Sequence, residues 1–146
     1  MKKKEIKDQL RKAKAAHKRW ITYAKAIHMG LPIDEGSVPI LDTECGFGKW
    51  YYGPAQVFDK LDSYQAIEQP HTMLHDLYMQ VYMLRSKPVK GGLFSSKKNK
   101  EKRKQEELDE LLTKIISTSD ILLQAIKNFE EDIEAMPESE IMQLMG

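Results

Sequence analysis

Apolar residues near the start of the chain recur every three or four positions. They form a stripe made of Ile6, Leu10, Ala13, His17, Trp20, Ala24 and Ile27. This spacing predicts an amphipathic helix whose stripe faces a core, with His17 inside the stripe. Gly30 and Pro32 follow, and we expect them to end the helix, because glycine accepts a left-handed conformation and proline cannot continue the helix.

A connecting segment over residues 31–41 leads to two short elements. Asp42 is a candidate N-cap for a short helix that carries Cys45 in its first turn, where the helix dipole favours a thiolate. Gly53 and Pro54 close this helix and open another element. The apolar face of that element is Val57, Phe58, Leu61 and Tyr64.

The next helix is predicted to begin at Pro70, since proline is common in a first helical turn. One side of this helix carries His71, Leu74, His75, Tyr78, Val81 and Tyr82. His71 and His75 are four residues apart, which places them one turn apart on the same face.

Residues 87–99 are rich in lysine, glycine and serine and are expected to form an exposed flexible loop. The last long helix is predicted to begin near Lys100. Its core-facing stripe is Leu108, Leu111, Ile115, Thr118 or Ser119, Leu122, Ile126, Phe129, Ile133 and Met136. Pro137 ends this helix, and the tail, 137–146, either folds back as a short amphipathic turn or frays.

These elements predict an all-α antiparallel helical bundle with four main helices and a short helix that carries the cysteine. We expect a single domain over residues 1–146, with a core spanning about 5–136.

The chain is 41% hydrophobic and 31% charged, as in soluble globular proteins. It lacks an apolar run long enough to cross a membrane, and no secretory signal is recognisable, so we expect a cytoplasmic protein. The single cysteine excludes an internal disulfide.

The net charge of +1 conceals a strong segregation of charge. Residues 1–30 hold ten Lys or Arg and two acids, which gives +8, and residues 105–146 hold two Lys and eleven acids, which gives −9. The two ends should therefore attract each other. A second basic block over residues 85–104 suggests an anionic partner such as nucleic acid or a lipid surface. Aromatic residues are not interleaved with these lysines as single-strand binding requires, so solvated helix faces and a loop are the favoured interpretation.

The candidate chemistry lies in three histidines and the only cysteine. His17, Cys45, His71 and His75 supply ligands of the types that zinc prefers. Imidazoles four residues apart on a helix reach one metal ion, and buried imidazoles without partners are costly, so a shared metal explains all three histidines. A nucleophilic Cys45 activated by a histidine remains an alternative.

Other metal and nucleotide sites do not fit the sequence. Thr72 stands where a metalloprotease has its general base, and Glu68 and His71 give only one of the two Glu-x-x-His units of a di-iron bundle. Gly46 and Gly48 have the wrong spacing for a phosphate-binding loop. We therefore expect a protein that is not an enzyme.

Three segments resemble a known family: His17-Lys-Arg-Trp20, Cys45-Gly-Phe-Gly-Lys-Trp50-Tyr-Tyr-Gly53 and His71-x-x-x-His75. They are similar to the chemoreceptor zinc-binding (CZB) domain family of bacteria, over roughly residues 10–130. The resemblance implies a small helical bundle that binds zinc through the three histidines and the cysteine. Family members usually regulate an attached chemoreceptor signalling region or a diguanylate cyclase, and some form homodimers. No output domain accompanies the bundle in this sequence, so we expect a free-standing member.

A closed site with three His and one Cys leaves no position for a catalytic water, so its role is to sense a stimulus or to stabilise the fold. The resemblance implies a response to zinc availability, or to oxidation of Cys45 by an agent such as hypochlorous acid, passed on to a protein partner. The alternative is a redox-reactive thiol protein or a structural interaction module in which metal is incidental.

Residues around the candidate site have their own expected roles. Trp20 and Trp50 are predicted to pack around it. The residues proposed as acceptors for the imidazole N–H groups are Glu44, Glu68 and Asp76. His28, the fourth histidine, is expected to interact with the end of the first helix instead of a metal.

Overall fold

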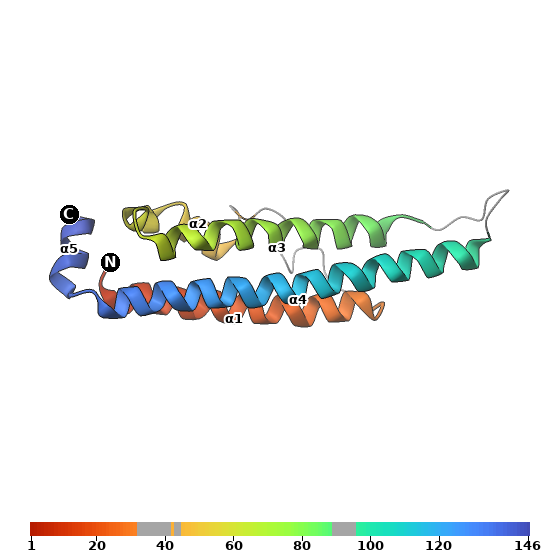
Figure 1. Ribbon diagram of the computed structural model, residues 1–146, viewed down its shortest axis with the longest axis horizontal. Coiled ribbons are helices and arrows are strands. Elements are labelled where there is room, and N and C mark those ends of the chain that lie inside the picture. The colour runs from red at the N-terminus through yellow and green to blue at the C-terminus, as the bar shows by residue number, and fades with distance from the viewer. Residues whose placement is uncertain (32–41, 43–44, 89–95) are drawn as a thin grey trace.

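Three long helices form the body of the molecule, and the computed structural model describes residues 1–31, 42, 45–88 and 96–146. The long helices are α1 (Lys3–His28), α3 (Asp62–Ser86) and α4 (Lys97–Ala135). The short elements are α2 (Gly46–Tyr51), the 3-10 helix η2 (Pro54–Phe58) and α5 (Glu138–Met145). In Figure 1, α1 and α3 run in the same direction and α4 returns antiparallel to both. The predicted all-α helical bundle is confirmed.

The stripe predicted for the first helix is the buried face of α1. All seven of its positions are buried, including His17 at 0% exposure. The helix ends at His28, and Gly30 adopts a φ of 82° while its N–H donates to the carbonyl of Ile27. Glycine at this position ends the helix without the steric cost that a Cβ would bring, as the sequence predicted. Pro32 lies outside the described residues.

The prediction that a helix begins at Pro70 is wrong. Pro70 lies inside α3, which begins eight residues earlier at Asp62. The buried positions of α3 include Tyr64, Ile67, His71 and Leu74, so their three- and four-residue spacing continues through the proline. An interior proline costs about 3 kcal/mol or more, and packing of this continuous stripe offsets that cost. As a result the described residues form three long helices instead of the four main helices that we expected.

Helix α4 is the central element, because it packs against both α1 and α3. Its fully buried side chains are Ile115, Leu122, Ile126, Phe129 and Ile133. The helix begins at Lys97, three residues earlier than predicted, with Ser96 as its N-cap. Most of the predicted loop, residues 89–95, lies outside the described residues.

The attraction expected between the basic and acidic ends of the chain operates between α1 and α4. Lys7 pairs with Glu134 at 2.6 Å, and Lys14 pairs with Glu130 at 2.9 Å. Ion pairs at the surface or partly buried contribute little to stability individually, but they favour the antiparallel register of the two helices.

Helix α2 and η2 are joined to the bundle by a reciprocal tyrosine contact. Tyr51 and Tyr64 stack with ring centroids 4.2 Å apart, and each hydroxyl donates to the backbone carbonyl of the other residue. Between the two short elements, a Cβ on Gly53 would lie 2.6 Å from the carbonyl oxygen of Lys49, so only glycine fits at this turn. These contacts fix α2, and with it Cys45, against the start of α3.

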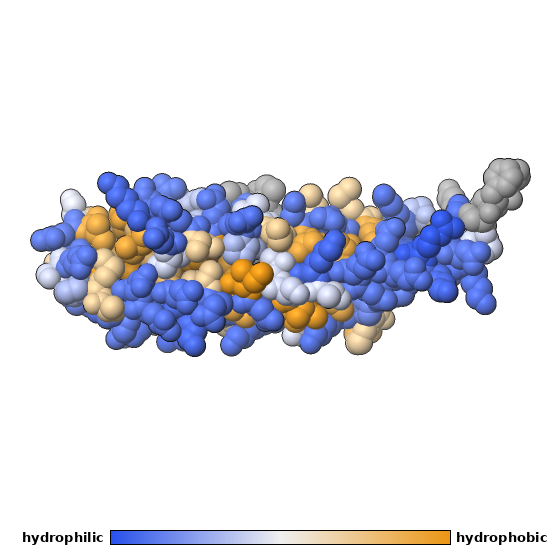
Figure 2. Space-filling model, in the orientation of Figure 1, coloured by the Kyte–Doolittle hydropathy of each residue, from blue (hydrophilic) through white to orange (hydrophobic). Residues whose placement is uncertain are grey.

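The tail folds back as α5, one of the two outcomes expected from the sequence. Ile141 is fully buried, and α5 contacts η2 at the end of the bundle where the N-terminus also lies (Figure 1). Space-filling colours show a surface that is largely hydrophilic on this face, with separate apolar patches (Figure 2). Among the helices described, none has the length and apolar character needed to cross a membrane.

Candidate metal centre

Three separate elements bring the candidate ligands together in the interior. His17 comes from the middle of α1, Cys45 from the start of α2, and His71 and His75 from the middle of α3. All four residues are buried. One ring nitrogen from each of the three histidines lies within 4.8 Å of the other two, a grouping suited to one metal ion.

The backbone of α1 orients the His17 imidazole. Its Nδ1 lies 2.7 Å from the carbonyl oxygen of Ala13, one turn earlier. A carbonyl only accepts hydrogen bonds, so Nδ1 carries the proton and Nε2 keeps its lone pair. Nε2 is buried and has no hydrogen-bond partner among the described residues. This arrangement, with one nitrogen bound to a carbonyl and the other available, is the usual one for a histidine that binds a metal.

Cys45 is the N-cap of α2 and does not lie in its first turn, which corrects the predicted register. Its Sγ accepts a hydrogen bond from the N–H of Gly48 at 3.1 Å, the contact that a capping side chain makes. The same sulfur lies 3.4 Å from Nε2 of His71. The cysteine sulfur therefore contacts the histidine cluster through His71.

His71 and His75 lie on one face of α3, as their spacing predicted. Their ring centroids are 4.8 Å apart and nearly perpendicular, and the His17 ring lies 5.4 Å from that of His71. Nδ1 of His71 is a second buried nitrogen without a hydrogen-bond partner in the described part of the chain. Burying such nitrogens is unfavourable unless a further group satisfies the cluster.

Aromatic rings enclose the histidines. The ring centroid of Trp20 lies 4.5 Å from that of His17 and 4.8 Å from that of His75. Phe47, which the sequence reasoning missed, lies 5.1 Å from His71. Trp50 packs on Phe47 at 6.1 Å, one layer further out than we expected. The position of Phe47 within the Cys-Gly-Phe-Gly segment was the available signal.

Burial decides the protonation of the histidines. Desolvation lowers the pKa of His17 to about 4, although its hydrogen bond to Ala13 opposes the shift. Desolvation, followed by the neighbouring imidazoles, lowers the pKa of His71 to about 3. Both rings are therefore neutral at pH 7, which is the form that binds metals.

The thiol of Cys45 is shifted in the opposite direction. Burial raises its pKa, and the hydrogen bond from Gly48 offsets only part of that effect. Without a metal the residue therefore favours the neutral thiol, which is a poor nucleophile. The alternative of a free reactive thiolate thus receives no support from the electrostatics.

Asp42 is the acidic residue that the structure places beside the site. Its carboxylate accepts hydrogen bonds from Thr72 at 2.7 Å and from Tyr52 at 3.1 Å. Burial raises the pKa of Asp42, but these bonds and the nearby His71 and His75 outweigh burial and hold it below its ordinary value. The sequence predicts Asp42 only as a helix cap.

The acceptors predicted from the sequence have different outcomes. Glu68 and Asp76 are exposed, whereas Glu44 lies outside the described residues. His28 contacts Asp109 of α4 at the bundle surface, away from the cluster. It is therefore separate from the three buried histidines.

A surface hollow of about 310 Å³ leads toward the site between α1 and α2. His17, Trp20 and Cys45 line it, together with the cationic side chains of Lys12 and Arg19. Small solutes in this hollow would lie next to the cysteine.

Three imidazoles and a thiol match the donor set of a structural zinc site. The buried Nε2 of His17 has no hydrogen-bond partner among the described residues and is available to bind a metal ion, so the residues present fit zinc. No curated protein and no solved structure significantly matches this chain. The sequence model of the family described as "chemoreceptor zinc-binding domain" matches residues 3–82, more than half of the chain. The matched range includes all four residues of the cluster. The chain therefore belongs to the chemoreceptor zinc-binding domain family.

Proposed function

We propose that His17, Cys45, His71 and His75 together bind one zinc ion, and that this site regulates a signalling partner. The observation that carries the proposal is the convergence of three imidazole nitrogens within 4.8 Å of one another in a buried space. The Cys45 sulfur, 3.4 Å from His71, completes a set of four donors. Membership of a zinc-binding family supports the choice of metal.

Zinc bound by four protein ligands supplies structural cross-linking and leaves no open position for substrate chemistry. In this chain the cross-link would connect α1, α2 and α3. Helix α2 has only six residues, and its attachments to the bundle include Cys45, the packing of Phe47 against His71 and the Tyr51–Tyr64 contact. Release of Cys45 would remove one of these attachments.

Cys45 is the ligand that a chemical stimulus would change. Oxidation of its thiolate to a sulfenic acid, for example by hypochlorous acid, lowers its strength as a donor. The hollow lined by Lys12 and Arg19 provides an approach to the sulfur. We propose that oxidation or zinc depletion frees α2, and that the changed surface is detected by a chemoreceptor or diguanylate cyclase type of partner, or by a second copy of the chain.

Metal analysis of single-site variants tests the ligand set. Zinc-loaded wild-type protein should contain one zinc per chain by native mass spectrometry, and C45A and H75A should lose it after dialysis. H28A is the matched control, because His28 is a histidine of the same bundle that contacts Asp109 instead of the cluster. Retention of zinc in both C45A and H75A, or its loss in H28A, would contradict the proposed site.

The signalling step has a separate test. Hydrogen exchange on zinc-loaded protein should increase in α2 after stoichiometric hypochlorous acid, with α4 unchanged. If zinc is lost without any change of hydrogen exchange in α2, the proposed release of α2 is wrong, although the proposed metal site is not contradicted.

A further inference from the structure

The end of the bundle opposite the N-terminus carries a concentration of positive charge that the zinc site does not use. Residues 97–104 contain six Lys or Arg and one acid, Glu101. The first buried residue of α4 is Leu108, so the eleven residues before it contribute nothing to the core. Figure 1 shows this part of α4 extending beyond the end of α3. Core packing therefore does not explain the segment.

Two cations at this end have structural partners. Lys104 donates to the carbonyl oxygens of Arg85 at 3.1 Å and Lys87 at 2.9 Å, at the C-terminus of α3. Arg85 in turn donates to the carbonyls of Ile27 and Leu31 at the C-terminus of α1. Cations are favoured at helix C-termini, so these two side chains hold the three helix ends together.

The remaining cations of residues 97–104 have no such role. In the part of the chain that the structure describes, no carboxylate forms an ion pair with any of them. They are Lys97, Lys98, Lys100, Lys102 and Arg103. Like charges three and four residues apart on a helix repel one another. A segment that buries nothing and repels itself is explained best by an anion that it binds.

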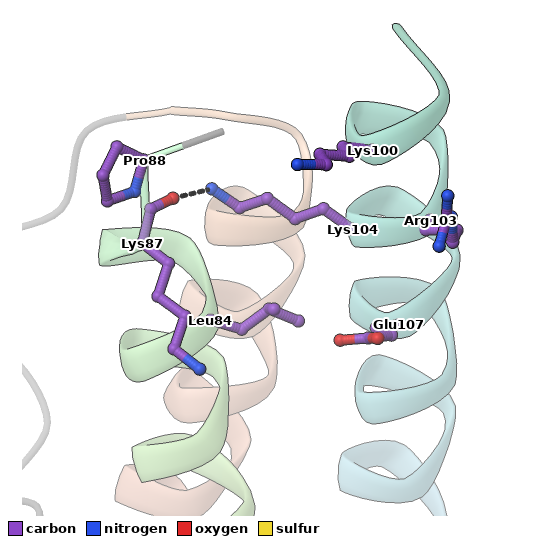
Figure 3. A pocket seen from close by; sticks show the side chains of 7 residues that line it. All are labelled: Leu84, Lys87, Pro88, Lys100, Arg103, Lys104 and Glu107. Atoms are coloured by element: carbon purple, nitrogen blue, oxygen red, sulfur yellow. Dashed lines mark hydrogen bonds between the residues drawn. The ribbon is translucent and has the colours of Figure 1, made fainter. Parts of the chain in front are cut away.

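A surface hollow of about 450 Å³ lies between the end of α3 and this segment. Its lining includes Lys87 of α3 and Lys100, Arg103 and Lys104 of α4, with a single acid, Glu107. Figure 3 shows Lys104 reaching across to Lys87, with Lys100 one turn away and also directed toward α3. Lys87, Lys100 and Arg103 line this space in addition to Lys104, whose ammonium already donates to two carbonyls. Such a lining matches an anion with several charges at short spacing.

Phosphate groups fit these features better than carboxylates do. A phosphate carries up to two charges on one small group, and arginine binds it through two parallel hydrogen bonds. Leu84 and Pro88 complete the lining and offer no acceptor side chain that would repel such a ligand. We propose that this hollow binds a ligand with two or more adjacent phosphate groups. This site is separate from the zinc site and does not depend on the function proposed above.

Titration calorimetry of the zinc-loaded chain, residues 1–146, tests the proposal with tripolyphosphate as the probe. We expect saturable binding that weakens as salt increases, since exposed charges are screened. K100E/R103E should lower the affinity about tenfold or more. E107Q, which removes the only acid in the lining, should raise it about two- to fivefold.

K114E/K127E is the matched control, because it makes the same charge change at exposed positions of the same helix. It should retain the wild-type affinity to within about twofold. Equal losses in the two double variants would indicate a response to net charge alone and would overturn the proposal. An absence of binding to tripolyphosphate and to vesicles of phosphatidylcholine with phosphatidylinositol bisphosphate would also overturn it.

The two probes distinguish the sources of the phosphate. Binding to free tripolyphosphate assigns the site to a soluble ligand. Binding to the bisphosphate vesicles alone, lost in K100E/R103E, assigns it to a lipid headgroup. Circular dichroism and zinc content should be unchanged in all variants, which keeps a failure here distinct from a failure of the zinc site.

Discussion

The histidine cluster and the apolar layer around Phe129 are both fully buried, but they differ in what they need. In the apolar layer, Phe129 packs on Phe58 at 5.6 Å and on Tyr64 at 5.9 Å, and no polar group is left to satisfy. In the cluster, His17 and His71 each keep a buried nitrogen without a hydrogen-bond partner among the described residues. The first region is complete with the chain alone, whereas the second gains from a bound ion. We therefore expect the apolar layer to determine the stability of the fold, and the histidine cluster to determine how that stability depends on metal.

The largest expected effect is in the apolar layer. Phe129→Ala should lower the free energy of unfolding by about 3–5 kcal/mol, because it removes a fully buried ring and leaves a cavity. Urea unfolding of the zinc-loaded protein measures the loss. Zinc content should remain at one per chain while the variant is folded, and loss of zinc from folded F129A would show that the two regions are not separable.

Zinc removal should produce the next largest effect and act on the other region. A ligand present at about a hundred to a thousand times its Kd stabilises the folded state by about 3–4 kcal/mol. The melting temperature should fall by roughly 10 °C on chelation in a chain of this size. Hydrogen exchange should increase around Cys45 and His71 and stay low around Phe129. A uniform loss of protection from hydrogen exchange would contradict the expected difference between the two regions.

Acidification should destabilise the zinc-free protein through its buried histidines. Unfolded imidazoles take up protons as the pH falls through 6.5, whereas His17 and His71 stay neutral in the fold down to about pH 4 and 3. The unfolded state then binds more protons, so the free energy of unfolding should decrease by about 2 kcal/mol between pH 6.5 and 5.5. Urea titrations at both pH values measure it.

The surface histidine provides the control for that pH dependence. His28→Gln should keep the same decrease, because His28 contacts Asp109 at the surface and not the buried cluster. A zinc-free protein whose stability did not change over this range would show that the cluster is not held neutral by burial.

The smallest expected effect comes from the acid beside the cluster. Asp42→Asn should weaken zinc binding by about tenfold, because it removes a negative charge close to His71 and His75 and alters the bonds to Thr72 and Tyr52. Competition with a chromophoric chelator measures the affinity. Asp109→Asn, at an exposed position on α4, should leave the zinc affinity unchanged. Equal effects of the two substitutions would show that Asp42 does not influence the site.

Much of the fold could be predicted from periodicity. The α1 stripe was predicted residue by residue, because a helix with one buried face repeats its apolar positions every three or four residues. The start of α3 is not predicted correctly, because Pro70 resembles a first-turn proline although the spacing of Tyr64, Ile67 and His71 continues through it. A proline is a local signal, and the packing that outweighs it involves residues from another helix.

For the candidate site, the chain by itself determined the types of donor and the pairing of His71 with His75, since these depend only on residue identity and helical spacing. Tertiary structure decided the rest. It brought the α1 imidazole, the Cys45 sulfur and the α3 pair into one buried space, and it placed Phe47 and Asp42 around them. Contacts between residues far apart in the sequence depend on how whole helices pack, and no local pattern of residues encodes that packing.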